Sequence, residues 1–214
     1  MNKKNKGLFI TFEGVEGGGK TTNISFIAEK IRKSGPQILL TREPGGTTTG
    51  EAIRNILISK ELPSMHHHTE LLLMFAARSE HLHRKIIPAL EQGTWVLCDR
   101  FTDASYAYQG AGRGIDRENI NMLENMVQST NQGTLKPDIT FLFDLEANIG
   151  LARAQRRGET DRFEQEHIDF FNRVRSEYLK MAEAEPKRFH LINAQHDLKT
   201  VQQQISKKLE EILA

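Results

Sequence analysis

The chain has 214 residues, of which 38% are hydrophobic and 27% charged, and its formal net charge at pH 7 is +1. This length and composition fit one globular domain over residues 1–214 and exclude a disordered chain. Neither nucleic acid nor a membrane is expected as a partner, because the net charge is near zero and no apolar run reaches membrane-spanning length. The apolar run after the basic N-terminus is too short for a signal peptide. The only cysteine, Cys98, excludes an intrachain disulfide and is expected to be a buried, unreactive thiol. These properties fit a cytoplasmic protein.

Apolar patterns predict strands and helices in alternation along the chain. The predicted strands comprise residues 8–12, 37–41, 94–98, 138–142 and 188–192. The predicted helices comprise residues 21–33, 49–59, 69–91 with a bend at Pro88, 102–109, 116–129, 146–157, 165–183 and 198–213, and residues 110–114 form a loop. This order predicts an α/β fold in which a five-stranded parallel sheet is flanked by helices on both faces. Ligands of such sheets bind at the carboxyl ends of the strands.

A phosphate-binding motif follows the first predicted strand. Gly14, Gly19, Lys20 and Thr21 match the pattern G-x-x-x-x-G-K-[ST], and a predicted helix follows them. Glycines let successive N–H groups turn toward phosphate oxygens, and the helix N-terminus adds positive charge. Lys20 reaches the β- and γ-phosphates in such loops, and the Thr21 hydroxyl binds Mg²⁺. The rest of the predicted nucleotide triphosphate site consists of Val15, Glu16, Gly17, Gly18 and Thr22.

Two further groups of charged residues suit phosphoryl transfer. Asp99 and Arg100 end the third predicted strand, where an acid beside a phosphate loop assists Mg²⁺ and a guanidinium faces phosphate; the alternative is a surface ion pair. A second group surrounds residues 158–159 and consists of Arg153, Arg156, Arg157 and Arg162. These arginines are either a solvated helix face or part of a mobile lid over the transferred phosphoryl group. Since positions 15–18 hold no basic residue, this group is the best source of the cation that the transition state needs.

The chain resembles the bacterial thymidylate kinases, a branch of the P-loop nucleoside monophosphate kinases. The segments that carry the resemblance are F-E-G-V-E-G-G-G-K-T-T at 12–22, T-R-E-P-G-G-T at 41–47, F-A-A-R at 75–78, D-R-F at 99–101, Y-A-Y-Q-G-x-G-R-G at 106–114 and D-R-F-E at 161–164. The resemblance implies a three-layer P-loop kinase fold with a short lid at about 153–164. It also implies phosphorylation of dTMP to dTDP with ATP and Mg²⁺, and a homodimer.

The same resemblance implies roles for individual residues. Glu16 would contact the sugar 3′-hydroxyl of dTMP, Arg100 the acceptor phosphate, and Asp99 and Thr21 the metal. Arg78 and Gln109 would bind the thymine edge, and Tyr108 would exclude a ribose 2′-hydroxyl. Further dTMP contacts are expected from Arg42, Pro44, Arg54 and Ser105. In the lid, Arg153 and Arg157 would supply catalytic charge and Glu164 would steady the lid or the metal, while Asn193 would lie beside the adenine.

One position departs from the family pattern. Many members have Phe four residues before the arginine that corresponds to Arg78, whereas this chain has Met74 there and Phe75 next to it. Both lie near Arg78 on a helix, so either side chain is a candidate for covering the base.

Other interpretations remain open. His66, His67 and His68 suggest metal binding, but adjacent histidines share no face and no further ligands complete a site. A nucleotide-dependent switch would keep the phosphate loop without an acceptor, and a kinase of the same fold could use another acceptor. The sequence alone leaves undecided the selectivity for dTMP over dUMP, which depends on contacts to one methyl group, and the oligomeric state.

Overall fold

A computed structural model of the chain describes residues 7–158 and 162–213, with the Arg157 side chain left out. Five parallel strands form one sheet in the order β2-β3-β1-β6-β7. They are β1 (Phe9–Glu13), β2 (Ile38–Arg42), β3 (Trp95–Asp99), β6 (Ile139–Asp144) and β7 (Phe189–Asn193). The central strand β1 is buried along its whole length, which explains its uninterrupted apolar run. The predicted five-stranded parallel sheet is confirmed.

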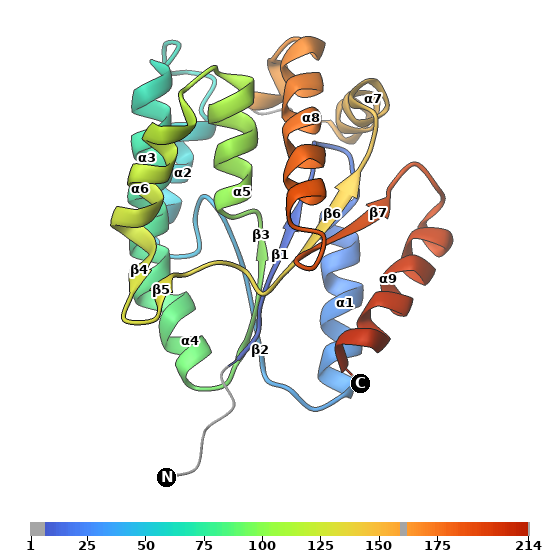
Figure 1. Cartoon of the computed structure of the whole chain (residues 1–214). Helices are drawn as coiled ribbons and strands as arrows, with labels where there is room; N and C mark the ends of the chain where they lie inside the picture. The colour runs from blue at the N-terminus through green and yellow to red at the C-terminus, as the bar shows by residue number, and fades with distance from the viewer. Residues whose placement is uncertain (1–6, 159–161, 214) are drawn as a thin grey trace.

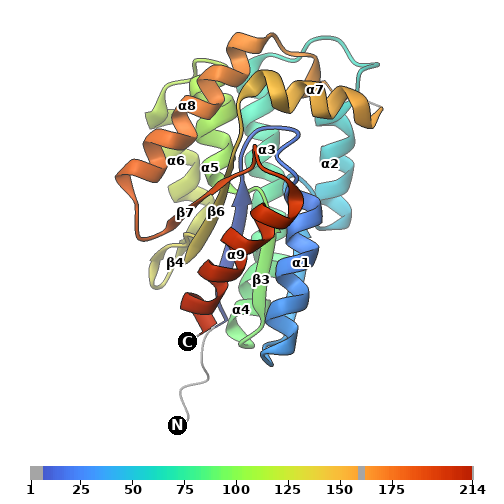
Figure 2. The same cartoon turned by 90° about the vertical axis from the view of Figure 1, so that its right-hand side faces the viewer.

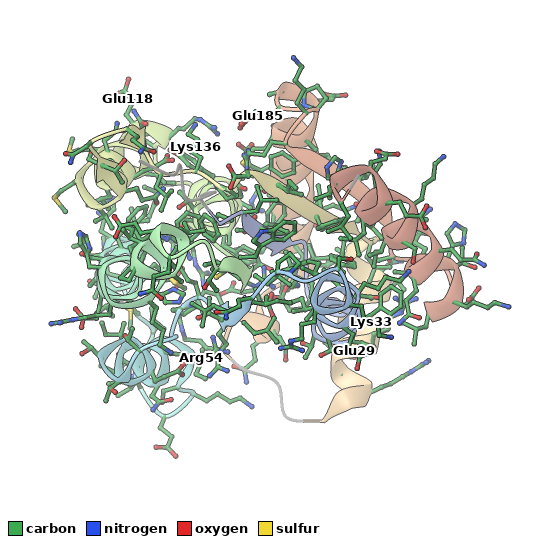
Figure 3. All side chains as sticks on the ribbon, turned by 90° about the horizontal axis from the view of Figure 1, so that it is seen from below. Glu29, Lys33, Arg54, Glu118, Lys136 and Glu185 are labelled. Atoms are coloured by element: carbon green, nitrogen blue, oxygen red, sulfur yellow. The ribbon has the colours of Figure 1, made fainter. Side chains whose placement is uncertain are left out.

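Helices cover both faces of the sheet. They are α1 (Lys20–Lys33), α2 (Thr48–Ile58), α3 (His67–His81), α4 (Ile87–Glu91), α5 (Thr102–Ser105), α6 (Arg117–Gln128), α7 (Ala147–Arg157), α8 (Ile168–Ala184) and α9 (Leu198–Leu213). In Figures 1 and 2, α1 and α9 cover one face, whereas α3, α5, α6 and α8 cover the other. The exposed Glu29 and Lys33 mark the outer side of α1 (Figure 3). These three layers bury a core rich in Phe and Ile side chains.

Two π-helical segments differ from the prediction. Leu82–Ile86 joins α3 to α4, so the irregularity of this long helix precedes Pro88. Pro88 has no N–H group for the carbonyl of Arg84, and the N–H of Ile87 bonds to the Leu82 carbonyl five residues back. Tyr106–Gly112 continues α5, so part of the predicted loop at 110–114 is helical.

Short elements escaped the sequence patterns. Ser129–Thr130 (β4) and Gly133–Thr134 (β5) pair as an antiparallel hairpin, and Phe163–Gln165 forms a 3₁₀ turn before α8. Each is too short to show a periodic pattern of apolar residues.

The register of the strands aligns their carboxyl ends, where ligands of such sheets bind. Asp99 lies opposite Arg42 and Phe12, and Asp144 lies opposite Asn193, so the carboxyl ends of the strands form one level. Cys98, one residue before that level, is fully buried as expected. None of the described helices is long and apolar enough to cross a membrane.

Candidate active site

The loop between β1 and α1 is a compact turn made possible by glycine. Gly14, Gly17 and Gly19 have φ angles of 127°, 73° and 76°, a region that side chains with a Cβ rarely adopt. A Cβ at Gly17 would also lie 2.2 Å from the carbonyl oxygen of Gly150 in α7, so α7 packs directly on the loop backbone. The other residues predicted to bind phosphate lie in the same turn or at the start of α1: Val15, Glu16, Gly18, Thr21 and Thr22. The motif therefore has the geometry of an anion-binding loop at a helix N-terminus.

Lys20 is the buried cation of this loop. Its Nζ donates hydrogen bonds to the carbonyl oxygens of Gly14 (2.9 Å) and Val15 (3.0 Å). Burial, and then the nearby positive charge of Arg100, lower the pKa of Lys20 to about 8. A polyphosphate in the loop opposes both effects, because its charge stabilises the ammonium and offsets the field of Arg100.

Asp99 and Thr21 are suited to hold a magnesium ion whose other ligands come from the substrate phosphates. Both residues line one open groove beside the loop. The Asp99 Oδ1 atom is buried and has no hydrogen-bond partner among the described residues, a situation that costs about 1–3 kcal/mol until a donor such as metal-bound water arrives. No set of three His, Cys, Asp or Glu side chains in the described part of the chain is arranged to hold a metal alone. The remaining ligands would therefore be phosphate oxygens and water.

A cavity of about 90 Å³ opens beside the loop, between α2, α3 and the segment that follows β3. All the residues predicted to bind dTMP line it, except Arg42 and Phe75. Arg42 lies instead in the groove of Asp99, where its Nη2 is 2.8 Å from Glu51 Oε2. Arg54, by contrast, lines the cavity and donates to the Pro44 carbonyl at 3.0 Å. The structure thus brings together residues separated by about half the chain.

The cavity wall also includes residues that sequence reasoning missed. These are Glu43, Ile58, Phe101, Ala104 and Phe163. Glu43, Phe101 and Phe163 belong to the segments T-R-E-P-G-G-T, D-R-F and D-R-F-E, so the signal was present in those segments. No pattern in the sequence marked Ile58 or Ala104.

Arg78 is fixed in the cavity wall with one nitrogen, Nη1, to spare. Its Nε lies 2.7 Å from Glu43 Oε2, and its Nη2 donates to Ser105 Oγ and the Phe101 carbonyl, both at 3.1 Å. Its Nη1 is buried and has no partner among the described residues. A rigid guanidinium whose Nη1 group is unused suits the carbonyl oxygen of a planar ring.

Met74 and Phe75, the two candidates for covering the base, have different surroundings. Met74 lines the cavity, whereas Phe75 is 2% exposed in the core, with its ring centroid 4.5 Å from the Arg78 guanidinium carbon. Phe75 therefore packs against the Arg78 guanidinium on the core side, and Met74 is the side chain that faces the cavity.

Glu16, Arg100 and Tyr108 form one connected group between the loop and the cavity. Arg100 Nη2 is 2.8 Å from Glu16 Oε1, and the Tyr108 hydroxyl lies 2.8 Å and 2.7 Å from the two Glu16 oxygens. Burial is the main cause that raises the pKa of Tyr108 well above its ordinary value, so the phenol keeps its proton and donates to Glu16. This arrangement presents a carboxylate and a guanidinium together, as recognition of a sugar phosphate requires.

The backbone at Arg100 is strained. Its φ angle of 67° makes it the one residue other than glycine with positive φ in the described part of the chain. Two hydrogen bonds hold it there, from its N–H to the Phe12 carbonyl and from its Nη1 to the Gly14 carbonyl, both 3.0 Å long. Such strain is common at functional sites, and here it turns the guanidinium toward the loop.

Gln109 lies in the cavity wall and is held by Glu70. Its Nε2 donates to Glu70 Oε1 at 2.8 Å, and both residues are almost fully buried. Because a carboxylate only accepts hydrogen bonds, the amide nitrogen must face Glu70 and the amide oxygen is the atom left for a ligand.

The residues predicted for the lid are spread over two places. Arg153 donates to the carbonyl oxygens of Ala194 (2.8 Å) and Gln195 (3.3 Å), beside Asn193 at the end of β7. Arg162 instead donates to Glu70 Oε2 at 2.7 Å, at the edge of the cavity. Arg156 is exposed, and Glu164 lies in the 3₁₀ turn. The Arg157 side chain and residues 159–161 lie outside the described residues.

A larger cavity, of about 370 Å³, lies beside the amino ends of β6 and β7. Glu118, Lys136 and Glu185 lie around it (Figure 3). Its central cation, Arg188, is paired with Asp103 and Glu185 at 2.6 Å and 2.9 Å. These two carboxylates neutralise Arg188, and ligands seldom bind at the amino ends of the strands. We therefore do not assign this cavity as the candidate site.

Comparisons with known proteins agree with this geometry. The family model described as thymidylate kinase matches residues 12–205. A thymidylate kinase of Pseudomonas syringae pv. tomato is 54% identical over 207 residues, which cover 97% of each chain, and one of Pseudomonas fluorescens is 52% identical over the same coverage. The crystal structure of thymidylate kinase from Ehrlichia chaffeensis superposes with a TM-score of 0.75 at 34% identity, covering 95% of this chain and 99% of that one. The chain therefore belongs to the thymidylate kinase family.

Proposed function

We propose that this chain transfers the γ-phosphoryl group of ATP to dTMP and releases dTDP and ADP, the reaction of its family. The donor would bind in the loop of Gly14–Thr21 and the acceptor in the cavity beside it. The observation that carries this proposal is the cavity wall itself, which combines the buried Nη1 group of Arg78, unpaired within the described part of the chain, with the Gln109 amide and the Glu16–Arg100 pair. A pyrimidine monophosphate has matching groups for both parts of the wall.

The acceptor contacts follow from the chemistry of each side chain. Arg78 would donate to a carbonyl oxygen of the thymine, and Met74 would pack on the ring. Arg100 would bind the acceptor phosphate, while Glu16 would accept from the sugar 3′-hydroxyl. The buried ring of Tyr108 would leave no room for a ribose 2′-hydroxyl. A role for Arg42 or Arg54 toward the acceptor phosphate is part of this proposal, and Arg54 has the stronger support because it lines the cavity.

The transfer needs positioning and charge rather than a strong base. A phosphate monoester dianion is already a competent nucleophile, so an acceptor oxygen attacks the γ-phosphorus in line and the bond to the ADP oxygen breaks. Lys20 would hold the β- and γ-phosphates as the charge spreads. Mg²⁺, held through Thr21 and Asp99 together with the phosphates, would supply neutralising charge.

The remaining positive charge is proposed to come from α7. Positions 15–18 contain no cation, whereas α7, which packs on the loop at Gly17, carries Arg153 and Arg157 as candidates to approach the transferred group. Arg153 donates to two carbonyl oxygens of the loop after β7, which supports a place for α7 beside the bound ATP, and Asn193 in that loop is proposed to lie beside the adenine. Glu164 is proposed to steady this lid.

We also propose a homodimer built on α3 and α6, two neighbouring helices. Leu72, Met122 and Met126 are 57%, 67% and 72% exposed on these helices, which contact each other, and exposed large apolar side chains are typical of an interface. Size-exclusion chromatography with light scattering tests this: M126K should shift the mass to that of one chain, and a wild-type monomer would refute the dimer. We propose a cytoplasmic location as well, since ATP and nucleoside monophosphates are available there.

One assay tests the proposed reaction. ADP release is coupled to a spectroscopic signal and measured with dTMP, dUMP, dCMP, AMP and thymidine as acceptors. We expect the highest kcat/KM with dTMP, and almost no turnover in K20A or R100A although both variants fold. Slow ADP release that ignores dTMP would indicate a nucleotide switch, and a preference for another acceptor would refute the substrate.

A further inference from the structure

Glu70 is a buried carboxylate that touches neither proposed substrate yet joins three parts of the site. It lies in the first turn of α3 and is fully buried. Its Oε1 accepts from Gln109 at 2.8 Å and from Arg113 Nε at 3.3 Å, and its Oε2 accepts from Arg162 at 2.7 Å and from Arg113 Nη2 at 3.2 Å. Both oxygens are thus fully used. Burying a carboxylate is costly unless hydrogen bonds and opposite charges replace its lost hydration, and here two guanidiniums and one amide do so.

The charges around Glu70 keep it ionised. Burial opposes ionisation, but hydrogen bonds from Gln109 and Arg162 and the charge of Arg113 together lower its pKa below the ordinary value. Glu166 contributes the second negative charge, since its Oε1 is 2.5 Å from Arg113 Nη1. Two guanidiniums therefore face two carboxylates, and only Glu70 also contacts an amide of the cavity wall.

An ionised Glu70 can only accept hydrogen bonds, and this fixes which end of the Gln109 amide faces it. The nitrogen must face Glu70, so the oxygen faces the cavity that Gln109 lines. Arg78 lines the same cavity, and its buried Nη1 group has no partner among the described residues. The wall therefore combines one acceptor with one donor. Thymine offers an N–H donor at N3 and an acceptor at O4, whereas cytosine offers an acceptor at N3 and a donor at N4.

The other oxygen of Glu70, Oε2, binds the arginine that packs against Phe163 in the cavity wall. Arg162 binds Glu70 and also donates through Nε to the Leu57 carbonyl at 2.9 Å. Its guanidinium carbon is 4.6 Å from the ring of Phe163, which lines the cavity. The phenyl wall is therefore fixed to the same carboxylate that orients Gln109.

We infer that Glu70 is a positioning residue that sets base selectivity: it orients the Gln109 amide to accept from thymine and reject cytosine, and through Arg162 it holds Phe163 against the bound base. This inference rests on the proposed dTMP site. Oε1 of Glu70 orients Gln109 and Oε2 binds Arg162, so different variants can remove the two effects separately.

The test compares kcat/KM for dTMP and dCMP in the wild type, E70Q, R162M and E166Q. A neutral amide at position 70 can donate as well as accept, which frees Gln109 to turn over. In E70Q we expect the preference for dTMP over dCMP to fall about tenfold or more, the value of one reoriented hydrogen bond, with KM for ATP unchanged. R162M should raise KM for dTMP and keep the base preference, because Gln109 remains held by Glu70.

E166Q is the matched control, since it removes a partner of Arg113 without touching Gln109, and it should keep the wild-type preference. If E70Q does not fold, E70D serves in its place, because it keeps the charge but withdraws the oxygens from Gln109, and the same loss of preference is expected. A full dTMP preference in a folded E70Q or E70D would overturn the inference. A wild type that fails to prefer dTMP would instead refute the proposed function, so the two failures are distinguishable.

Discussion

Arg78 provides the sharpest test of the acceptor cavity, through the substitution R78K. Lysine keeps the positive charge opposite Glu43 but replaces a planar fork with a single ammonium. In the wild type, Nη2 donates to both Ser105 and the Phe101 carbonyl, and Nη1 is left for a ligand. One ammonium near Glu43 cannot reach all these places, so R78K loses the ligand contact and leaves a buried carbonyl without a donor.

The expected magnitudes follow from those lost bonds. One net hydrogen bond and one unsatisfied buried carbonyl together cost about 2–4 kcal/mol, which lowers Tm by about 5–15 °C. A hydrogen bond from a charged donor contributes about 1.5–3 kcal/mol, so Kd for dTMP should rise about 10- to 150-fold. KM for ATP should not change, because Arg78 does not line the groove beside the phosphate loop.

Isothermal titration of dTMP and a thermal melt measure both quantities. S105A is the control: it removes one acceptor of Nη2 and leaves Nη1 in place, so dTMP binding should weaken far less than in R78K. A folded R78K that binds dTMP as tightly as the wild type would show that Arg78 is only a structural cation and refute the assignment.

Three further predictions concern the phosphate loop and the strand before it. Since the pKa of Lys20 is about 8 in the free protein, binding of ATP above that pH requires proton uptake, and Kd should rise with pH between 8 and 9.5 in the wild type but not in K20R, measured by calorimetry. Burial, and then the charge of Asp103, raise the pKa of Glu13 to about 8. Between about pH 4.5 and 8 the folded protein therefore holds a proton that the unfolded chain has lost. The free energy of unfolding, measured with urea, should fall from about pH 5.5 to 7.5, and it should fall less in E13Q. In G17A, the clash with Gly150 and the positive φ should cost about 2 kcal/mol or more of unfolding free energy, and an unchanged urea midpoint would contradict the close packing of α7 on the loop.

Sequence patterns predicted the sheet because its strands are short, apolar and separated by helices of ordinary length. They did not predict where helices become irregular. The π-helical Tyr106–Gly112 contains two glycines, which favour a loop on propensity alone, yet Gly112 is buried in the packed interior. A Cβ there would lie 2.5 Å from the Phe170 ring of α8, so close packing of two helices decides the conformation.

The sequence by itself determined the phosphate loop, since strand, glycine turn, Lys20 and Thr21 are consecutive and their chemistry depends on local geometry. It also named most residues of the acceptor cavity through family resemblance. Only the tertiary structure decided how they face each other. Met74 and Phe75 differ by about 100° around the axis of α3, and the packing of that helix puts one in the cavity and the other beneath Arg78. Glu70 had no signal in the sequence, because its role depends on partners 39 and 92 residues away that only folding brings to one carboxylate.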